Sequence, residues 1–188
     1  VMITCAAALA GAAPALAQKA RDVARISVYE PVATLDNTFE PQPQTSLFSN
    51  MVFDFLLAFD SEERALKPSV AESWRQVDPR TVEFKLRKDI VFHDGHPLDA
   101  DDVVYTANFM IDPKVVFRTK ETRYGIIERV EKVDQYTVRL ITRTPFAPLL
   151  TRLASTLPIF PAHIHSKLAD KSTFGRAPVG SGPYRALP

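Results

Sequence analysis

Hydrophobic and polar residues alternate in three stretches of the chain. Residues 25–29, 81–87 and 136–140 place apolar side chains at every second position, which is the pattern of a strand with one face against a core. In residues 81–87 charged side chains occupy the alternate positions, so we expect that face of the strand to lie in solvent. Three short strands are therefore predicted.

Apolar residues recur at helical spacing over residues 46–59. They form one broad stripe, which predicts a single amphipathic helix packed against a core. The polar stretch before it, residues 34–45, contains two prolines and one asparagine and predicts a loop, with Thr45 or Ser46 as the cap of the helix.

Residues 93–95, His-Asp-Gly, predict a tight turn, because glycine tolerates positive φ. A second helix is predicted to begin after Asp99, because its carboxylate can accept the free backbone N–H groups of a first helical turn. Asp112 and Pro113 end this helix. A shorter amphipathic helix is predicted over residues 146–153. Strands alternating with capped helices indicate a mixed α/β or α+β sheet domain.

The N-terminal segment, residues 1–17, has no charged residue and ends in Ala-Leu-Ala. Small residues at these positions suit a signal peptidase, so we expect a signal peptide cleaved after Ala17 and an exported, periplasmic chain of residues 18–188. Cleavage would also remove Cys5, the only cysteine, and a mature chain without thiols suits an oxidising compartment. The alternative is an alanine-rich helix that stays on the protein.

Charge and composition exclude some classes of protein. Lys plus Arg number 23 against 22 for Asp plus Glu, so the basic excess needed to neutralise nucleic-acid phosphates is missing. His163 and His165 are two residues apart and would point to different faces of a helix. Because we find no evident ligand set, we expect no metal and no cofactor, and we interpret Asp99, Asp101 and Asp102 as helix-capping residues.

Several blocks resemble the extracellular solute-binding proteins of family 5, which deliver peptides, nickel chelates, opines or some sugars to ABC importers. The blocks occur in the order of that family and extend over nearly all of the expected mature chain. They are residues 66–74, 82–95, 97–105, 134–140, 145–149 and 178–184.

The resemblance implies the first lobe of a periplasmic-binding-protein type II fold, with the second lobe absent from this sequence. Ligand would bind between two lobes, and the closed form would dock on an ABC permease and ATPase complex. Family members are more than twice as long, so we expect a truncated product, a fragment or half of a split gene, whose second lobe a partner chain could supply.

Two sets of site residues follow from this resemblance. Gln42, Gln44 and Thr45 lie where relatives place residues of the first lobe against the ligand, and their amides and hydroxyl could hydrogen-bond a peptide or other polar solute. The residues Gly180, Ser181 and Gly182 are expected to form a turn with hinge duty. A phosphate-binding loop is less suitable there, because its lysine is absent and Pro183 follows.

Three rival hypotheses remain. A secreted hydrolase would need a nucleophile elbow, a His-Glu-x-x-His motif or a distinctive pairing of histidine with a nucleophile, and the sequence contains none of these. An exported chaperone-like module would bind unfolded chains through exposed apolar surface. A fragment without function is the third alternative, which the sequence cannot separate from the first lobe of a binding protein.

Overall fold

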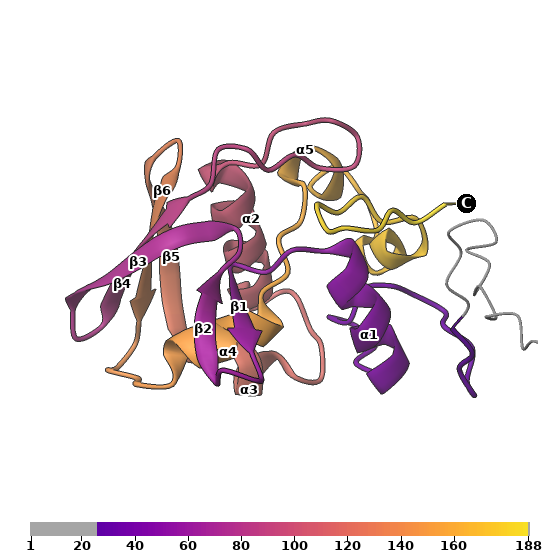
Figure 1. Ribbon diagram of the computed structural model, residues 1–188, viewed down its shortest axis with the longest axis horizontal. Coiled ribbons are helices and arrows are strands. Elements are labelled where there is room, and N and C mark those ends of the chain that lie inside the picture. The colour runs from indigo at the N-terminus through magenta and orange to yellow at the C-terminus, as the bar shows by residue number, and fades with distance from the viewer. Residues whose placement is uncertain (1–25, 188) are drawn as a thin grey trace, which may run out of the picture.

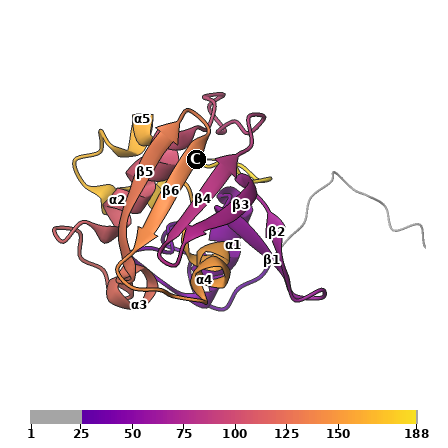
Figure 2. The same cartoon turned by 90° about the vertical axis from the view of Figure 1, so that its left-hand side faces the viewer.

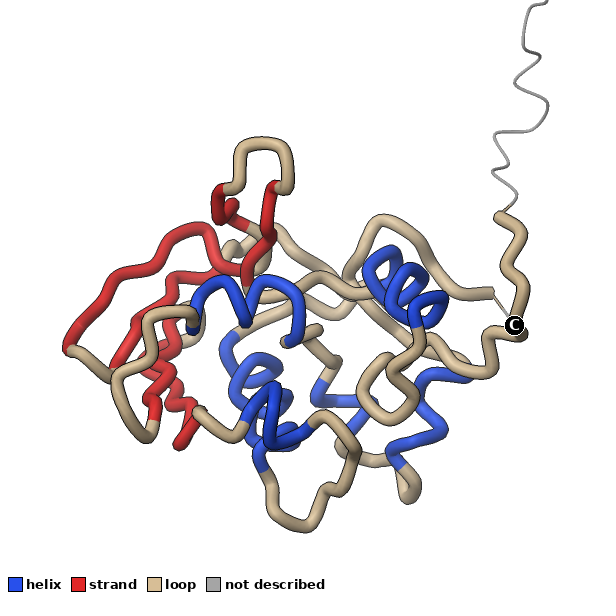
Figure 3. Tube along the Cα trace, turned by 90° about the horizontal axis from the view of Figure 1, so that it is seen from below, coloured by secondary structure: helices blue, strands red, loops and turns tan. Residues whose placement is uncertain are grey.

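The computed structural model describes residues 26–187, and Figure 1 shows their arrangement. The predicted signal peptide and its cleavage site lie outside these residues. A four-stranded sheet stands at one side of the molecule, and α1 lies on the other side beside the C-terminal segment (Figure 1). Figure 3 shows the same separation from below.

The elements, in chain order, are α1 (Pro43–Val52), β1 (Leu57–Asp60), β2 (Ala65–Pro68), β3 (Ala71–Asp78), β4 (Thr81–Leu86), α2 (Ala100–Ile111), α3 (Lys120–Tyr124), β5 (Ile127–Asp134), β6 (Thr137–Thr142), α4 (Leu149–Thr156), α5 (Ala162–His165) and the 3-10 helix η1 (Lys171–Arg176).

The main sheet is antiparallel with the order β3-β4-β6-β5 (Figure 2). Two hairpins, β3-β4 and β5-β6, are joined in the middle by the pairing of β4 with β6. β1 and β2 form a separate hairpin. The strands predicted at 81–87 and 136–140 are confirmed as the two central strands, and β3 and β5, which we did not predict, complete the sheet.

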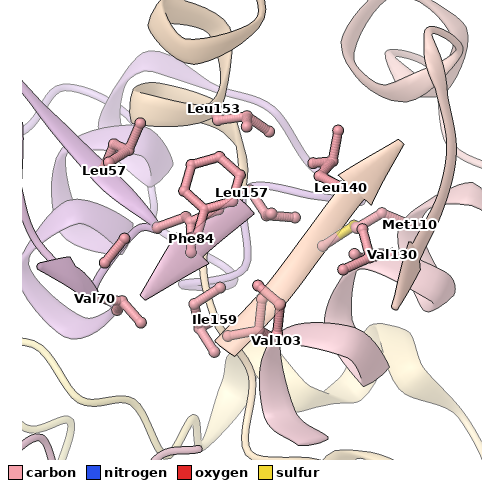
Figure 4. Close-up of a cluster of buried hydrophobic side chains, with 14 of the residues drawn as sticks. Leu57, Val70, Phe84, Val103, Met110, Val130, Leu140, Leu153, Leu157 and Ile159 are labelled. Carbon is pink, nitrogen blue, oxygen red and sulfur yellow. The ribbon is translucent and has the colours of Figure 1, made fainter. Parts of the chain in front are cut away.

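One face of the sheet carries the hydrophobic core. Phe84 of β4 and Leu140 of β6 are almost fully buried against Val103 and Met110 of α2, as Figure 4 shows. Trp74 pairs with Phe84 across the β3-β4 hairpin and packs, partly buried, against this core.

The predicted start of α2 is confirmed in detail. The Asp99 carboxylate accepts the backbone N–H of Asp101 at 2.8 Å, and Asp102 accepts the backbone N–H of Asp99 at 3.1 Å. Together they form a capping box. Asp102 also accepts the N–H of Ala162 at 2.8 Å and so fastens α5 to this end of α2. Asp99 and Asp102 thus cap the helix as the sequence predicted, whereas the Asp101 carboxylate lies in the first turn and accepts a hydrogen bond from Lys132 at 2.8 Å.

The opposite face of the sheet is less open to solvent than expected. Glu83 is only 6% exposed, because it lies between Arg75 and Arg139 on the neighbouring strands and accepts a hydrogen bond of 2.8 Å from each guanidinium. These hydrogen bonds hold the pKa of Glu83 below its usual value. Ion pairs with the two neighbouring strands therefore bury Glu83, which the alternating sequence pattern predicted to lie in solvent.

The prediction of one helix over residues 46–59 was wrong at both ends. α1 begins three residues earlier, with Gln42 as its N-cap and Pro43 in its first turn, so neither Thr45 nor Ser46 is the cap. It ends at Val52, and the chain then becomes extended. Strand pairing overrides the helical spacing here, because Phe55 bridges to Pro158 and the next residues pair with β2.

The strand predicted over residues 25–29 is also not formed. Arg25 lies outside the described residues, and residues 26–30 contain no strand. Ile26 and Val28 are 48% and 36% exposed. An alternating segment needs a neighbour with which to exchange backbone hydrogen bonds, and none of the described strands lies beside this one.

His165 is buried in a cluster of aromatic rings. Its ring is stacked 4.9 Å from that of Phe160, and its Nδ1 lies 2.6 Å from the Tyr105 hydroxyl. Burial raises the pKa of Tyr105 to about 12, so this hydroxyl keeps its proton at neutral pH. Burial, with the nearby charge of Lys171, lowers the pKa of His165 to about 4.

We therefore expect acid to destabilise the fold through His165. Unfolded histidine binds a proton near pH 6.5, whereas folded His165 does so only near pH 4, so stability is lost as the pH falls between these values. Going from about pH 7.5 to about pH 5 should lower the free energy of unfolding by about 2 kcal/mol through this group. Urea unfolding at both pH values tests this, with His165→Phe as the comparison. An equal loss in both proteins would contradict it.

Candidate functional site

The two predicted sets of site residues lie at opposite ends of α1. Gln42, Gln44 and Thr45 form its N-cap and first turn, and the segment 180–182 packs against its last residues. Gln44 and Val52 are eight positions apart in α1, which is roughly 12 Å along the helix axis. The structure therefore connects the two sets through one helix without bringing them into contact.

At the N-terminal end of α1, the three predicted residues have different surroundings. The Gln42 side chain is exposed, while the Gln42 backbone carbonyl accepts hydrogen bonds from both the N–H and the hydroxyl of Ser46. Gln44 is buried and donates from its amide to the Glu30 carboxylate at 2.9 Å. Thr45 is only 3% exposed. Gln42 is thus the most accessible of the three.

At the C-terminal end of α1, the segment 180–184 runs alongside the helix. The N–H of Gly182 donates to the Val52 carbonyl at 2.9 Å, and the N–H of Tyr184 donates to the Met51 carbonyl at 3.0 Å. The chain bends at residues 181–183, near the predicted turn. A Cβ at position 180 would collide with the Val52 carbonyl oxygen. Glycine is needed there for close approach of two backbones.

The loop between β4 and α2 borders the other side of this segment. The turn predicted at residues 93–95 is present, with Gly95 at φ +89°, and it places His93 against Gly180 and Gly182. This contact of His93 was not predicted from the sequence. The available signal was its place in a block of the family resemblance.

Two hollows, of about 290 and 420 Å³, meet beside this segment at Asp54 and Ser69. The first is polar, and Arg87, Asp89 and Ser181 are among its lining residues. Partial burial raises the pKa of the Asp54 carboxyl group, while Ser181 and the positive charge of Arg87 oppose that shift. The apolar second hollow is lined by Asn50, Phe53, Phe55, Leu57, Ala58, Phe59 and Ala154 in addition to the two shared residues.

The histidines are distributed among separate environments. His163 lies 2.7 Å from the Asp94 carboxylate and stacks on His96, whereas His165 is buried among aromatic rings. Within residues 26–187, no group of three or more His, Cys, Asp or Glu side chains is placed to hold a metal ion. Over the same residues, we find no helix with the length and hydrophobicity to cross a membrane.

The sheet domain, with α1 and the C-terminal segment beside it, is the fold of the first lobe of type II periplasmic binding proteins. The profile of "Bacterial extracellular solute-binding proteins, family 5 Middle" matches residues 65–186. This chain belongs to family 5 of the bacterial extracellular solute-binding proteins, as its sequence blocks indicated.

Individual relatives agree with this assignment. Protein XP55 of Streptomyces lividans is 38% identical over 140 residues, which are 72% of this chain and 25% of that protein. The oligopeptide-binding protein AppA of Bacillus subtilis is 31% identical over 175 residues, 89% of this chain and 32% of that one. The chain thus spans about a quarter to a third of the length of these relatives.

Solved structures show the same partial overlap. AppA of B. subtilis in complex with a nonapeptide superposes with a TM-score of 0.76 at 28% identity, covering 84% of this chain and 32% of that one. NikZ of Campylobacter jejuni in complex with Ni(L-His) gives 0.73 at 27% identity, covering 83% and 31%. The mixed α/β architecture and its place in the type II fold are therefore established.

Proposed function

We propose that this chain forms the first lobe of an extracytoplasmic binding protein that captures peptides, or a related small polar solute, for an ABC importer. The observation that carries the proposal is the family match over residues 65–186 on a fold that superposes on ligand-bound relatives. AppA is named an oligopeptide-binding protein, and the AppA and NikZ structures are complexes with a nonapeptide and with Ni(L-His), which favours a binding role over the hydrolase alternative.

The mechanism that suits this architecture is closure of two lobes on a ligand. A solute that contacts both lobes only when they are shut shifts the open–closed equilibrium toward the closed form. The second lobe would come from further sequence or from a partner chain, and the closed form would dock on a permease and ATPase complex. Segment 180–182 would connect the lobes.

Export is part of the same proposal. Residues 1–17 would direct the chain to the periplasm and be removed after Ala17, leaving a mature protein without cysteine. Amino-terminal sequencing of the protein recovered from the periplasmic fraction tests this. A first residue of Gln18 would support the proposal, and a retained segment 1–17 would contradict it.

Ligand binding by the intact protein tests the proposed substrate class. Peptides of two to nine residues should raise the midpoint of thermal unfolding, because a ligand that binds only the folded state stabilises it by about 2.7 kcal/mol at a hundredfold excess over Kd. A defined panel of such peptides, with the free amino acids as controls, makes the measurement. No shift with any peptide would contradict peptide capture.

Gln42 is our first choice for ligand contact in this lobe, because its side chain is exposed and has no capping hydrogen bond within α1. We expect Gln42→Ala to weaken peptide affinity about three- to tenfold, which corresponds to the loss of one hydrogen bond. Isothermal calorimetry measures the change. Gln135→Ala, an exposed glutamine in the turn between β5 and β6, is the matched control and should leave affinity unchanged. Equal affinities for the Gln42→Ala and wild-type proteins would remove Gln42 from the site.

A further inference from the structure

The turn that carries His93 is held firmly in place. Phe92 is 1% exposed and anchors the turn in the core. The backbone N–H of Phe92 donates to the carbonyl of His96 at 2.8 Å, and that of Gly95 donates to the carbonyl of Phe92 at 2.8 Å. Gly95 closes the turn in the left-handed region, which favours glycine. His93 therefore extends from a rigid support.

From this support His93 makes three hydrogen bonds to the segment 180–182. Its backbone N–H donates to the Gly180 carbonyl at 2.8 Å, and its ring Nδ1 accepts from the Gly180 N–H at 3.3 Å. Its Nε2 lies 2.8 Å from the Gly182 carbonyl oxygen. A backbone N–H can only donate and a carbonyl can only accept, so the ring must be neutral, with its proton on Nε2.

The same segment is bound on its other side by α1. Gly182 and Tyr184 donate to the carbonyls of Val52 and Met51, as described above, and a Cβ at position 182 would lie 2.7 Å from the Met51 oxygen. The segment 180–184 is thus held between the turn that carries His93 on one side and α1 on the other.

We propose that His93 is a positioning residue, whose neutral ring fastens the segment 180–182 to the first lobe and so fixes the path of the chain toward the second lobe. This inference rests on the proposal that the segment 180–182 connects the lobes. In this arrangement Gly180 and Gly182 are glycines because the backbone must pass close to α1. If this segment is held at a fixed position in the first lobe, closure becomes one defined rotation of the second lobe relative to the first.

Hydrogen exchange followed by NMR on the intact protein tests the proposal, using His93→Phe, His93→Gln and the matched control His96→Phe. Losing both ring bonds in His93→Phe should speed exchange of the Gly180, Gly182 and Tyr184 amides about tenfold relative to the amides of β4 and β6. Glutamine can still donate and accept, so His93→Gln should restore part of the protection. His96 contacts Pro97 and His163 but not this segment, so its variant should exchange like the wild type.

A spectroscopic measurement accompanies the exchange data. The 15N shifts of the His93 ring at neutral pH should identify Nδ1 as the unprotonated nitrogen and Nε2 as the protonated one. A ring protonated on Nδ1, or protection of the three amides that is unchanged in His93→Phe, would overturn the proposal. Peptide titration of the wild-type protein separately tests solute capture. Failure of that titration with the exchange pattern intact would reject the proposed function while leaving the attachment by His93 in place.

Discussion

Replacing Phe53 by alanine is expected to lower the free energy of unfolding by about 3–5 kcal/mol, the usual cost of removing a buried phenylalanine ring. Phe53 is 1% exposed, and its ring centroid lies 5.4 Å from that of Phe160 and 5.9 Å from that of Phe174. The deletion would leave a cavity where the end of α1 meets the C-terminal segment. Urea unfolding followed by the fluorescence of Trp74 measures the loss.

Phe59 offers a matched control for this substitution. It is the same residue type, six positions further along, but it is 46% exposed on β1. Phe59→Ala should cost less than about 1 kcal/mol, because little apolar area leaves the core. If both variants lost the same stability, the aromatic cluster around Phe53 would not be a packed core in solution.

Gly180→Ala is expected to lower the free energy of unfolding by about 3 kcal/mol, toward the upper end of the range for overpacking. The new methyl group would collide with the Val52 carbonyl oxygen and would also lie 3.0 Å from Cδ1 of Phe53. Backbone atoms cannot turn aside as a flexible side chain can, so the segment 180–184 must move away from α1. Urea unfolding measures the cost, and amide exchange at Gly182 and Tyr184 reports the displacement.

The neighbouring Ser181→Ala is the control, because it changes the same segment without adding an atom. It should change stability by less than about 1 kcal/mol. Equal stabilities for Gly180→Ala and the wild type would show that the segment 180–184 does not pass as close to α1 as the structure places it.

These two predictions concern one junction. Phe53 fills the space under the end of α1, Gly180 allows the C-terminal segment to approach it, and His93 holds that segment from the opposite side. The polar hollow containing Asp54 and Ser181 opens beside the same residues. A change at any of them should therefore alter how the segment 180–184 is held against α1.

The elements that the sequence predicted correctly are those decided by neighbouring residues. The capping box of Asp99 and Asp102 depends on two positions three residues apart, and the strands around Phe84 and Val138 depend on simple alternation. The turn at Gly95 requires only a residue that tolerates positive φ. The ordered sequence blocks likewise identified the family, because they need no three-dimensional information.

Tertiary structure decided the rest, for one physical reason: contacts distant in sequence can outweigh local preference. The apolar spacing of residues 46–59 fits a helix, yet pairing with β2 and Pro158 draws its second half into extended chain. Glu83 alternates as a solvent residue but is buried by two arginines from neighbouring strands. His93 lies 87 residues before Gly180, so only the folded chain could reveal their contact. The sequence by itself determined the family, the sheet domain and the helix start, whereas the ends of α1 and the attachment of the C-terminal segment followed from packing.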